Sequence, residues 1–164
     1  MKTLKVSLVA GVGTILVGSL VALWPQPGFA QGDPFLGTWV LNIAKSKYTP
    51  GPPPKSNTSV YEVAGQGVKV TTKGTHAAGK PTMTLYTANY DGKDYPVTGN
   101  PGWDGTTLKR EDTNTVEFTR KKAGKVVQTG TNVVSKDGKT RTITATGVNA
   151  QGQKINNVTV WEKK

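Results

Sequence analysis

The chain has 164 residues, with 21 lysines and arginines against 10 acidic residues and a formal net charge of +11. It contains no cysteine and a single histidine, His76. These counts exclude a disulfide scaffold, a lipid-anchored lipoprotein, a cysteine nucleophile and a zinc site built from several histidines or cysteines. A domain of this size must therefore be held together by its hydrophobic core.

Residues 1–30 have the composition of a secretory signal helix. A basic beginning is followed by an apolar run from Val6 to Trp24, and small residues precede a predicted cleavage site after Ala30. The 19-residue apolar run is also long enough to span a bilayer, so an uncleaved anchor is the alternative. We expect cleavage, because prolines break the helix just before the site. Residues 31–164 then form a single periplasmic or secreted domain without a membrane span.

The mature chain would keep 19 cationic and 10 acidic residues, a formal net charge of +9. A basic excess attracts polyanions, including those of a bacterial envelope. Solubility is the simpler interpretation, because the lysines are scattered singly or in pairs. We expect a monomer with no nucleic-acid partner.

The first predicted strand begins at "GTW", residues 37–39, where apolar and polar residues start to alternate. Gly37 allows a sharp bend into the strand, and Trp39 supplies a large ring that can close one end of a barrel. The alternative is that Trp39 is the largest core residue of an ordinary strand. A proline-rich stretch, Lys45–Ser56, follows and is predicted to be one ordered, extended loop.

Beyond this loop the sequence is rich in Thr and Val, alternates at period two, and is interrupted by glycines 13 to 19 residues apart. That interval holds one strand and one tight turn. Predicted strands span 37–44, 58–64, 67–74, 82–89, 94–98, 106–110, 115–121, 125–134, 139–147 and 154–162. We therefore predict an all-β fold, an antiparallel up-and-down barrel of eight to ten strands, because closure removes the edges of so long a meander.

Three segments carry a resemblance to known proteins. "FLGTWVLN", Phe35 to Asn42, and the closing "NVTVWEKK", Asn157 to Lys164, resemble the calycin group, which includes the lipocalins and fatty-acid-binding proteins. "DGKDYPVTGNP", Asp91 to Pro101, is similar to a segment of secreted bacterial lipocalin-like proteins whose activity is not settled. The resemblance implies a barrel outside the cytoplasm, and its calycin part favours a binding role over a structural one.

The same resemblance implies structural roles at one barrel end for Gly37 and Trp39. It implies a cation stacked over Trp39, for which Arg141 and Lys163 are the candidates. Fatty-acid-binding proteins often carry an Arg-x-Tyr on the last strand to hold the carboxylate. The matching positions here are Thr159 and Trp161. A fatty-acid assignment is therefore in doubt.

The arginines are the main ligand-binding candidates. Each of the three, Arg110, Arg120 and Arg141, lies two residues from an apolar neighbour in its strand and so shares a face with it. If that face is the interior, guanidinium groups can grip a carboxylate or phosphate there. The alternative is that a shift of one residue in register turns each of them to solvent.

Two aromatic residues, Tyr95 and Trp103, flank a turn-rich segment expected at one mouth of the barrel. They are candidates to stack on a ligand, or they hold the loop against its own barrel. The acidic residues fall mostly in turns, while Glu62 and Glu117 are predicted to face water from within strands. Since no paired acid and base emerges, we expect no catalysis, no metal and no cofactor.

Two functions remain open at this point. The first is an exported, lipocalin-like protein that binds a small hydrophobic or amphiphilic molecule, with or without an anionic head. The alternative is a non-catalytic interaction or structural protein of the cell envelope, which uses a basic outer surface on polyanions or on a protein partner.

Overall fold

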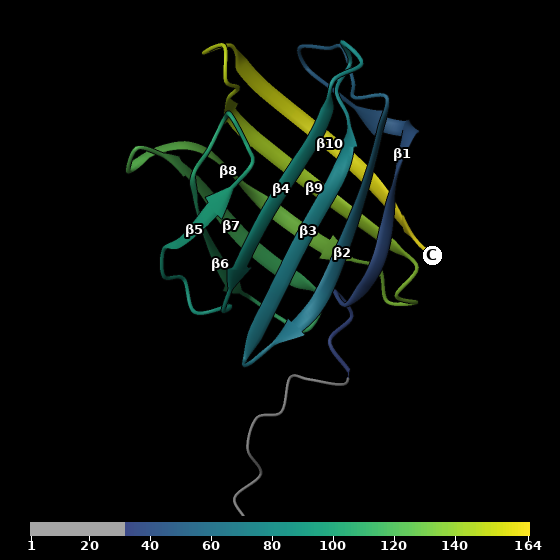
Figure 1. Ribbon diagram of the computed structural model, residues 1–164. Helices are drawn as coiled ribbons and strands as arrows, with labels where there is room; N and C mark the ends of the chain where they lie inside the picture. The colour runs from purple at the N-terminus through teal and green to yellow at the C-terminus, as the bar shows by residue number, and fades with distance from the viewer. Residues whose placement is uncertain (1–31) are drawn as a thin grey trace, which may run out of the picture.

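The computed structural model describes residues 32–164 as ten antiparallel strands closed into one barrel (Figure 1). The strands are β1 (Gly37–Lys47), β2 (Ser56–Ala64), β3 (Gly67–Thr75), β4 (Pro81–Ala88), β5 (Tyr95–Thr98), β6 (Gly105–Arg110), β7 (Thr115–Lys122), β8 (Lys125–Val134), β9 (Thr140–Val148) and β10 (Lys154–Lys163). The signal peptide predicted over residues 1–30 lies outside the described residues. Within the described range, no helix is long and apolar enough to cross a membrane.

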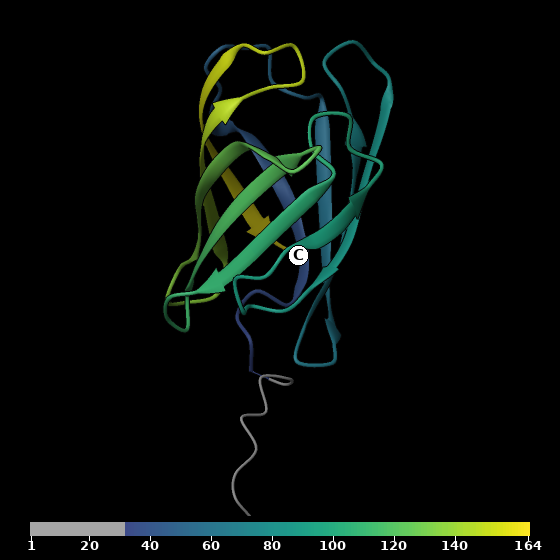
Figure 2. The same cartoon turned by 90° about the vertical axis from the view of Figure 1, so that its left-hand side faces the viewer.

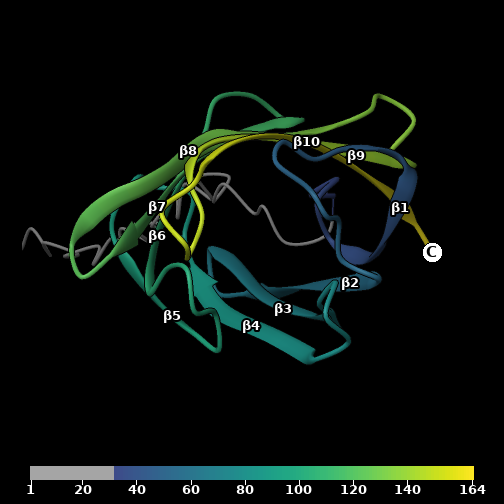
Figure 3. The same ribbon diagram turned by 90° about the horizontal axis from the view of Figure 1, so that it is seen from above.

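Each strand pairs with its neighbour in sequence, and β1 pairs with β10 to close the ring. Seen along the barrel, β8, β9 and β10 lie opposite β2, β3 and β4 (Figure 3). The predicted all-β meander is confirmed, and every predicted strand is present within three residues of its expected bounds. Glycine in tight turns is what makes these short connections possible.

The loop predicted over Lys45–Ser56 was wrong at both ends, because β1 continues to Lys47 and β2 begins at Ser56. A bulge between Asn42 and Lys47 lets β1 continue along β10. Within it the Ser46 hydroxyl donates to the Asn42 carbonyl (2.7 Å) and accepts from the Val160 N–H (2.9 Å). The Ser46 side chain therefore forms hydrogen bonds with the backbone of both strands, which the alternation pattern does not predict.

The two ends of the barrel differ. The segment that leads into β1, residues 33–36, lies at one end, which we call the plug end (Figures 1 and 2). The β9–β10 turn lies at the other end, which we call the mouth end, together with the connections β1–β2, β3–β4, β5–β6 and β7–β8. Buried apolar residues line the interior between them, including Val68, Val70 and Phe118.

Candidate ligand-binding site

Trp39 closes the plug end. Its side chain is fully buried, and its indole Nε1 donates to the Phe35 carbonyl at 2.8 Å. The Lys163 ammonium lies 4.9 Å from the centroid of the Trp39 ring and donates to the Pro34 carbonyl at 3.2 Å. Gly37 begins β1 at a φ of +112°, where glycine is favoured. Gly37 and Trp39 therefore both lie at the plug end, where they have structural contacts or a constrained backbone.

Arg141 is sealed among aromatic rings. Its side chain is 0% exposed, and its guanidinium carbon lies 5.1 Å, 4.5 Å and 4.9 Å from the ring centroids of Trp39, Tyr61 and Trp161. None of its three guanidinium nitrogens has a hydrogen-bond partner in the described chain. Burial lowers the pKa of Arg141, because a charged group is less stable away from water. The resemblance implied one cation over Trp39, from Arg141 or Lys163, and the structure places both candidates over that ring.

Arg110 belongs to the plug end. Its Nη2 forms an ion pair of 2.5 Å with Asp33, and its guanidinium carbon stacks 3.9 Å from the centre of the Tyr90 ring. Both partners of the ion pair are largely buried. Burial, followed by the charge of Asp33, raises the pKa of Tyr90. The charge of Arg110 therefore ties the segment before β1 to the barrel, and its role as a ligand contact stays a prediction.

Arg120 lies inside the barrel near the mouth end. Its Nη1 donates to the Gln128 side-chain oxygen at 2.8 Å, and the Gln128 amide donates in turn to the Val148 carbonyl at 3.0 Å. The guanidinium carbon is 4.6 Å from the Trp103 ring centroid and 4.5 Å from that of Phe118. Desolvation lowers the pKa of Arg120. Among the described residues it makes this one hydrogen bond and no ion pair.

The two aromatic candidates are placed differently. Trp103 is buried, and its ring packs edge to face against Tyr86 at 6.1 Å, with Arg120 over it. Tyr95 instead donates from its hydroxyl to the Asp91 carboxylate at 3.0 Å, which holds the connection before β5. The structure therefore brings Trp103 and Arg120 together and leaves Tyr95 outside that group.

We call the resulting group the Arg120 site. It consists of Tyr86, Trp103, Phe118, Arg120 and Gln128. The sequence did not point to Gln128, because the pairing of β7 with β8 shifts register at a bulge between Arg120 and Lys121. This shift places Gln128 opposite Arg120. Tyr86 was missed because the alternation of residues in β4 predicts which face of the sheet a side chain occupies. It does not predict which residue of another strand that side chain contacts.

No carboxylate faces the Arg120 site. Eight of the ten acidic side chains are on the exposed surface, including Glu62 and Glu117 as predicted. The remaining two are bound elsewhere, Asp33 by Arg110 and Glu162 by Lys45. The guanidinium of Arg120 is therefore an interior positive charge that no acidic residue of the protein neutralises.

An open groove of about 500 Å³ lies beside this site, between the mouth-end segments of β8, β9 and β10. Val126, Val127, Val148 and Ile155 give it apolar walls, and Gln128 and Lys154 give it polar ones. Because Gln128 lines the groove and also binds Arg120, the groove adjoins the site.

Over residues 32–164, no group of three or more histidine or acidic side chains is placed to hold a metal ion. His76 is exposed in the β3–β4 connection. Asp94, beside Tyr95, forms an ion pair of 2.7 Å with Lys121.

No protein-family model matches this chain, and no curated protein matches it. Among solved structures, the chain is similar to zebrafish ileal bile acid-binding protein complexed with cholic acid. The two share 14% sequence identity with a TM-score of 0.48, over 80% of this chain and 99% of the zebrafish chain. The closed ten-stranded barrel itself is established by the strand pairing.

Proposed function

We propose that this barrel binds a small, largely apolar molecule whose anionic head lies at Arg120. The observation that carries the proposal is an interior guanidinium whose only hydrogen-bond partner is a neutral amide. A desolvated cation is stabilised by a charged acceptor far more than by an amide. An anionic ligand would supply that acceptor.

The surroundings of Arg120 suit the rest of such a molecule. Trp103, Phe118 and Tyr86 supply aromatic surroundings for an apolar body, and an open groove lies next to Gln128. Arg141 is a poorer anchor, because its guanidinium is completely enclosed by rings. The proposed head group position is therefore nearer the mouth end than the plug end.

The proposal includes export to the periplasm or beyond and the absence of catalysis. Export is supported by the composition of residues 1–30. A purely binding role is supported by the surroundings of Arg120, which contain a cation, an amide and rings but no neighbouring carboxylate or histidine.

Two fluorescent probes of similar shape test the assignment. One is anilinonaphthalene sulfonate, which is apolar and anionic, and the other is the uncharged phenylnaphthylamine. Losing a hydrogen bond to a charged group costs about 1.5–3 kcal/mol. Arg120→Gln should therefore weaken stoichiometric binding of the sulfonate by about tenfold or more and change binding of the neutral probe by less than about twofold.

Lys136→Gln is the matched control, because it removes one positive charge from an exposed residue of the β8–β9 connection at the plug end. It should leave the affinity for both probes unchanged. Equal weakening of both probes by Arg120→Gln would contradict a head group at this arginine. Native mass spectrometry of protein purified from its host should in addition reveal a bound small molecule, and loss of that molecule in Arg120→Gln would link the probe result to the natural ligand.

A further inference from the structure

Charge is distributed unequally between the two ends of the barrel. In an antiparallel barrel, the ends of odd-numbered strands and the starts of even-numbered strands meet at one end, here the mouth end. The charged side chains in these connections and in the strand residues that border them are Lys47, Lys55, Lys80, Lys122, Lys125, Lys154 and Asp104. We call the six lysines the mouth rim. With one acid against six cations, this end is strongly basic.

At the plug end, charged side chains counted in the same way are equally positive and negative. Its acidic side chains are Asp33, Asp91, Asp94, Glu111, Asp112 and Asp137, and its cations are Lys93, Arg110, Lys136, Lys139, Lys163 and Lys164. Six acids therefore face six cations. The positive excess of this barrel is concentrated at one end and is not a uniform property of the outer surface.

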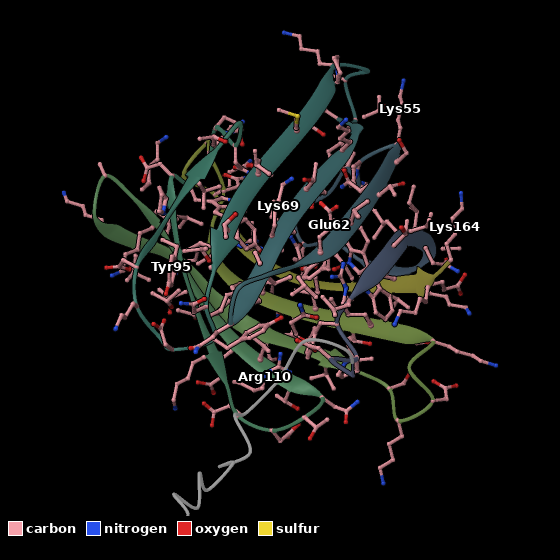
Figure 4. All side chains as sticks on the ribbon, turned by 60° about the horizontal axis from the view of Figure 1, so that its bottom comes forward. Lys55, Glu62, Lys69, Tyr95, Arg110 and Lys164 are labelled. Carbon is pink, nitrogen blue, oxygen red and sulfur yellow. The ribbon has the colours of Figure 1, made fainter. Side chains whose placement is uncertain are left out.

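The mouth-rim lysines are free to meet a partner. All six are exposed, and only Lys122 forms an ion pair among the described residues, a long one of 3.5 Å with Asp104. Lys55 extends outward on the side of the barrel away from Arg110 (Figure 4). Unpaired lysines keep their full charge available, so the mouth end presents a positive potential to any surface that approaches it.

Two of the four exposed large hydrophobic side chains of residues 32–164 accompany these lysines, and the other two, Val63 and Val133, lie near the plug end. Met83, the third residue of β4, is 47% exposed, and Val126, the second residue of β8, is 58% exposed. Both strands begin at the mouth end, so these side chains stand just behind the rim. The β1–β2 connection at the same end exposes Pro50, Pro52 and Pro53.

We propose that the mouth rim docks on the anionic surface of a lipid bilayer. The lysines come from four separate connections around a closed ring, which suits a flat partner that meets all of them at once better than it suits a narrow one. Lysines near an anionic bilayer are each worth about 1 kcal/mol, and apolar side chains beside them can enter the interface. This inference stands whether or not the interior binds a ligand.

Co-sedimentation with vesicles tests the inference. Protein purified from its host should bind vesicles of mixed phosphatidylglycerol and phosphatidylcholine, should not bind phosphatidylcholine alone, and should be released by salt. The triple variant Lys55→Gln, Lys80→Gln, Lys154→Gln should lose about 100-fold in affinity, since about 1 kcal/mol per lysine is about fivefold. The control triple variant Lys136→Gln, Lys139→Gln, Lys164→Gln removes the same charge from the plug end and should change the affinity by less than about threefold.

Each other outcome overturns the proposal. Equal losses in the two triple variants would mean that net charge alone governs binding. Tight binding to heparin without binding to vesicles would identify a soluble polyanion as the partner. Failure to bind anionic vesicles, with circular dichroism showing an intact β-barrel, would leave the mouth rim without a bilayer role.

Discussion

At the scale of single residues, the three arginines of this barrel have three different sets of partners. Arg110 has a carboxylate, Arg141 has the faces of three aromatic rings, and Arg120 has one amide oxygen. A buried charge is costly unless it is paired or bonded, so the quality of these partners ranks the three sites. Within the described chain Arg141 makes no hydrogen bond but is fully enclosed by its rings, whereas Arg120 is partly exposed and has a single neutral acceptor, and that is why we place the anionic head at Arg120.

The ion pair between Asp33 and Arg110 gives the first stability prediction. Asp33→Asn keeps the oxygen that accepts from the Phe35 N–H (3.0 Å) but removes the charge that faces Arg110. Breaking a buried pair leaves an uncompensated cation and costs about 3 kcal/mol. Denaturant unfolding should show this loss. Asp112→Asn, at an exposed carboxylate that accepts in the same way from the Asn114 N–H (2.7 Å), should change stability by less than about 0.5 kcal/mol.

A loss in Asp33→Asn no greater than that in the Asp112 control would mean that the other partners of Arg110, which include the rings of Phe35 and Tyr90 and the Thr113 carbonyl, compensate its charge. In that case the segment before β1 would be held mainly by packing.

At the scale of elements, the pairing of β1 with β10 decides whether the barrel closes. This pair joins strands from opposite ends of the described chain, and its register is irregular between Asn42 and Lys47. On the outside of the pair, the Glu162 carboxylate accepts from the Lys45 ammonium (2.9 Å) and from the Asn42 amide (3.0 Å). These bonds connect Asn42, where the bulge begins, and Lys45, within the bulge, across to β10.

The pair carries a pH dependence that follows from Glu162. Hydrogen bonds from Lys45 and then Asn42 hold the pKa of Glu162 below its usual value of 4.5. A depressed pKa in the folded state means that this carboxylate stabilises the fold above pH 4.5 and loses that effect as pH falls through the lower, folded value. Thermal unfolding of the protein and of Glu162→Gln should differ at neutral pH and converge in acid. A constant difference over that range would contradict a role for the charge.

At the scale of the whole molecule, the predicted cleavage site lies just before the residues that form the plug end. Cleavage after Ala30 would leave Asp33 and Phe35 in place, and these residues bind Arg110 and Trp39. A cleaved protein would thus retain everything that closes this end.

Intact-mass measurement of protein recovered from its host tests this processing. We expect a mass that corresponds to residues 31–164 and an N-terminus at Gln31, because prolines and small residues mark that site. A mass that includes residues 1–30 would instead establish an anchored protein and contradict release.

The sequence by itself determined the fold class and the strands. Alternation at period two and glycines at turn spacing are local signals, and a meander of this length has closure as its simplest way to remove exposed edges. The Gly-x-Trp resemblance also led to the structural role of Trp39, and the shared faces of arginines and apolar residues led to an interior position for Arg120 and Arg141.

Only the tertiary structure decided what surrounds each arginine. Alternation gives the face of a residue but not its depth along the barrel, which depends on how the strands are staggered and on bulges such as the one after Arg120. Those features put Arg141 among three rings, Arg110 beside Asp33, and Arg120 beside Gln128. The basic mouth rim likewise emerges only when scattered lysines are gathered by an antiparallel topology that brings alternate connections to one end.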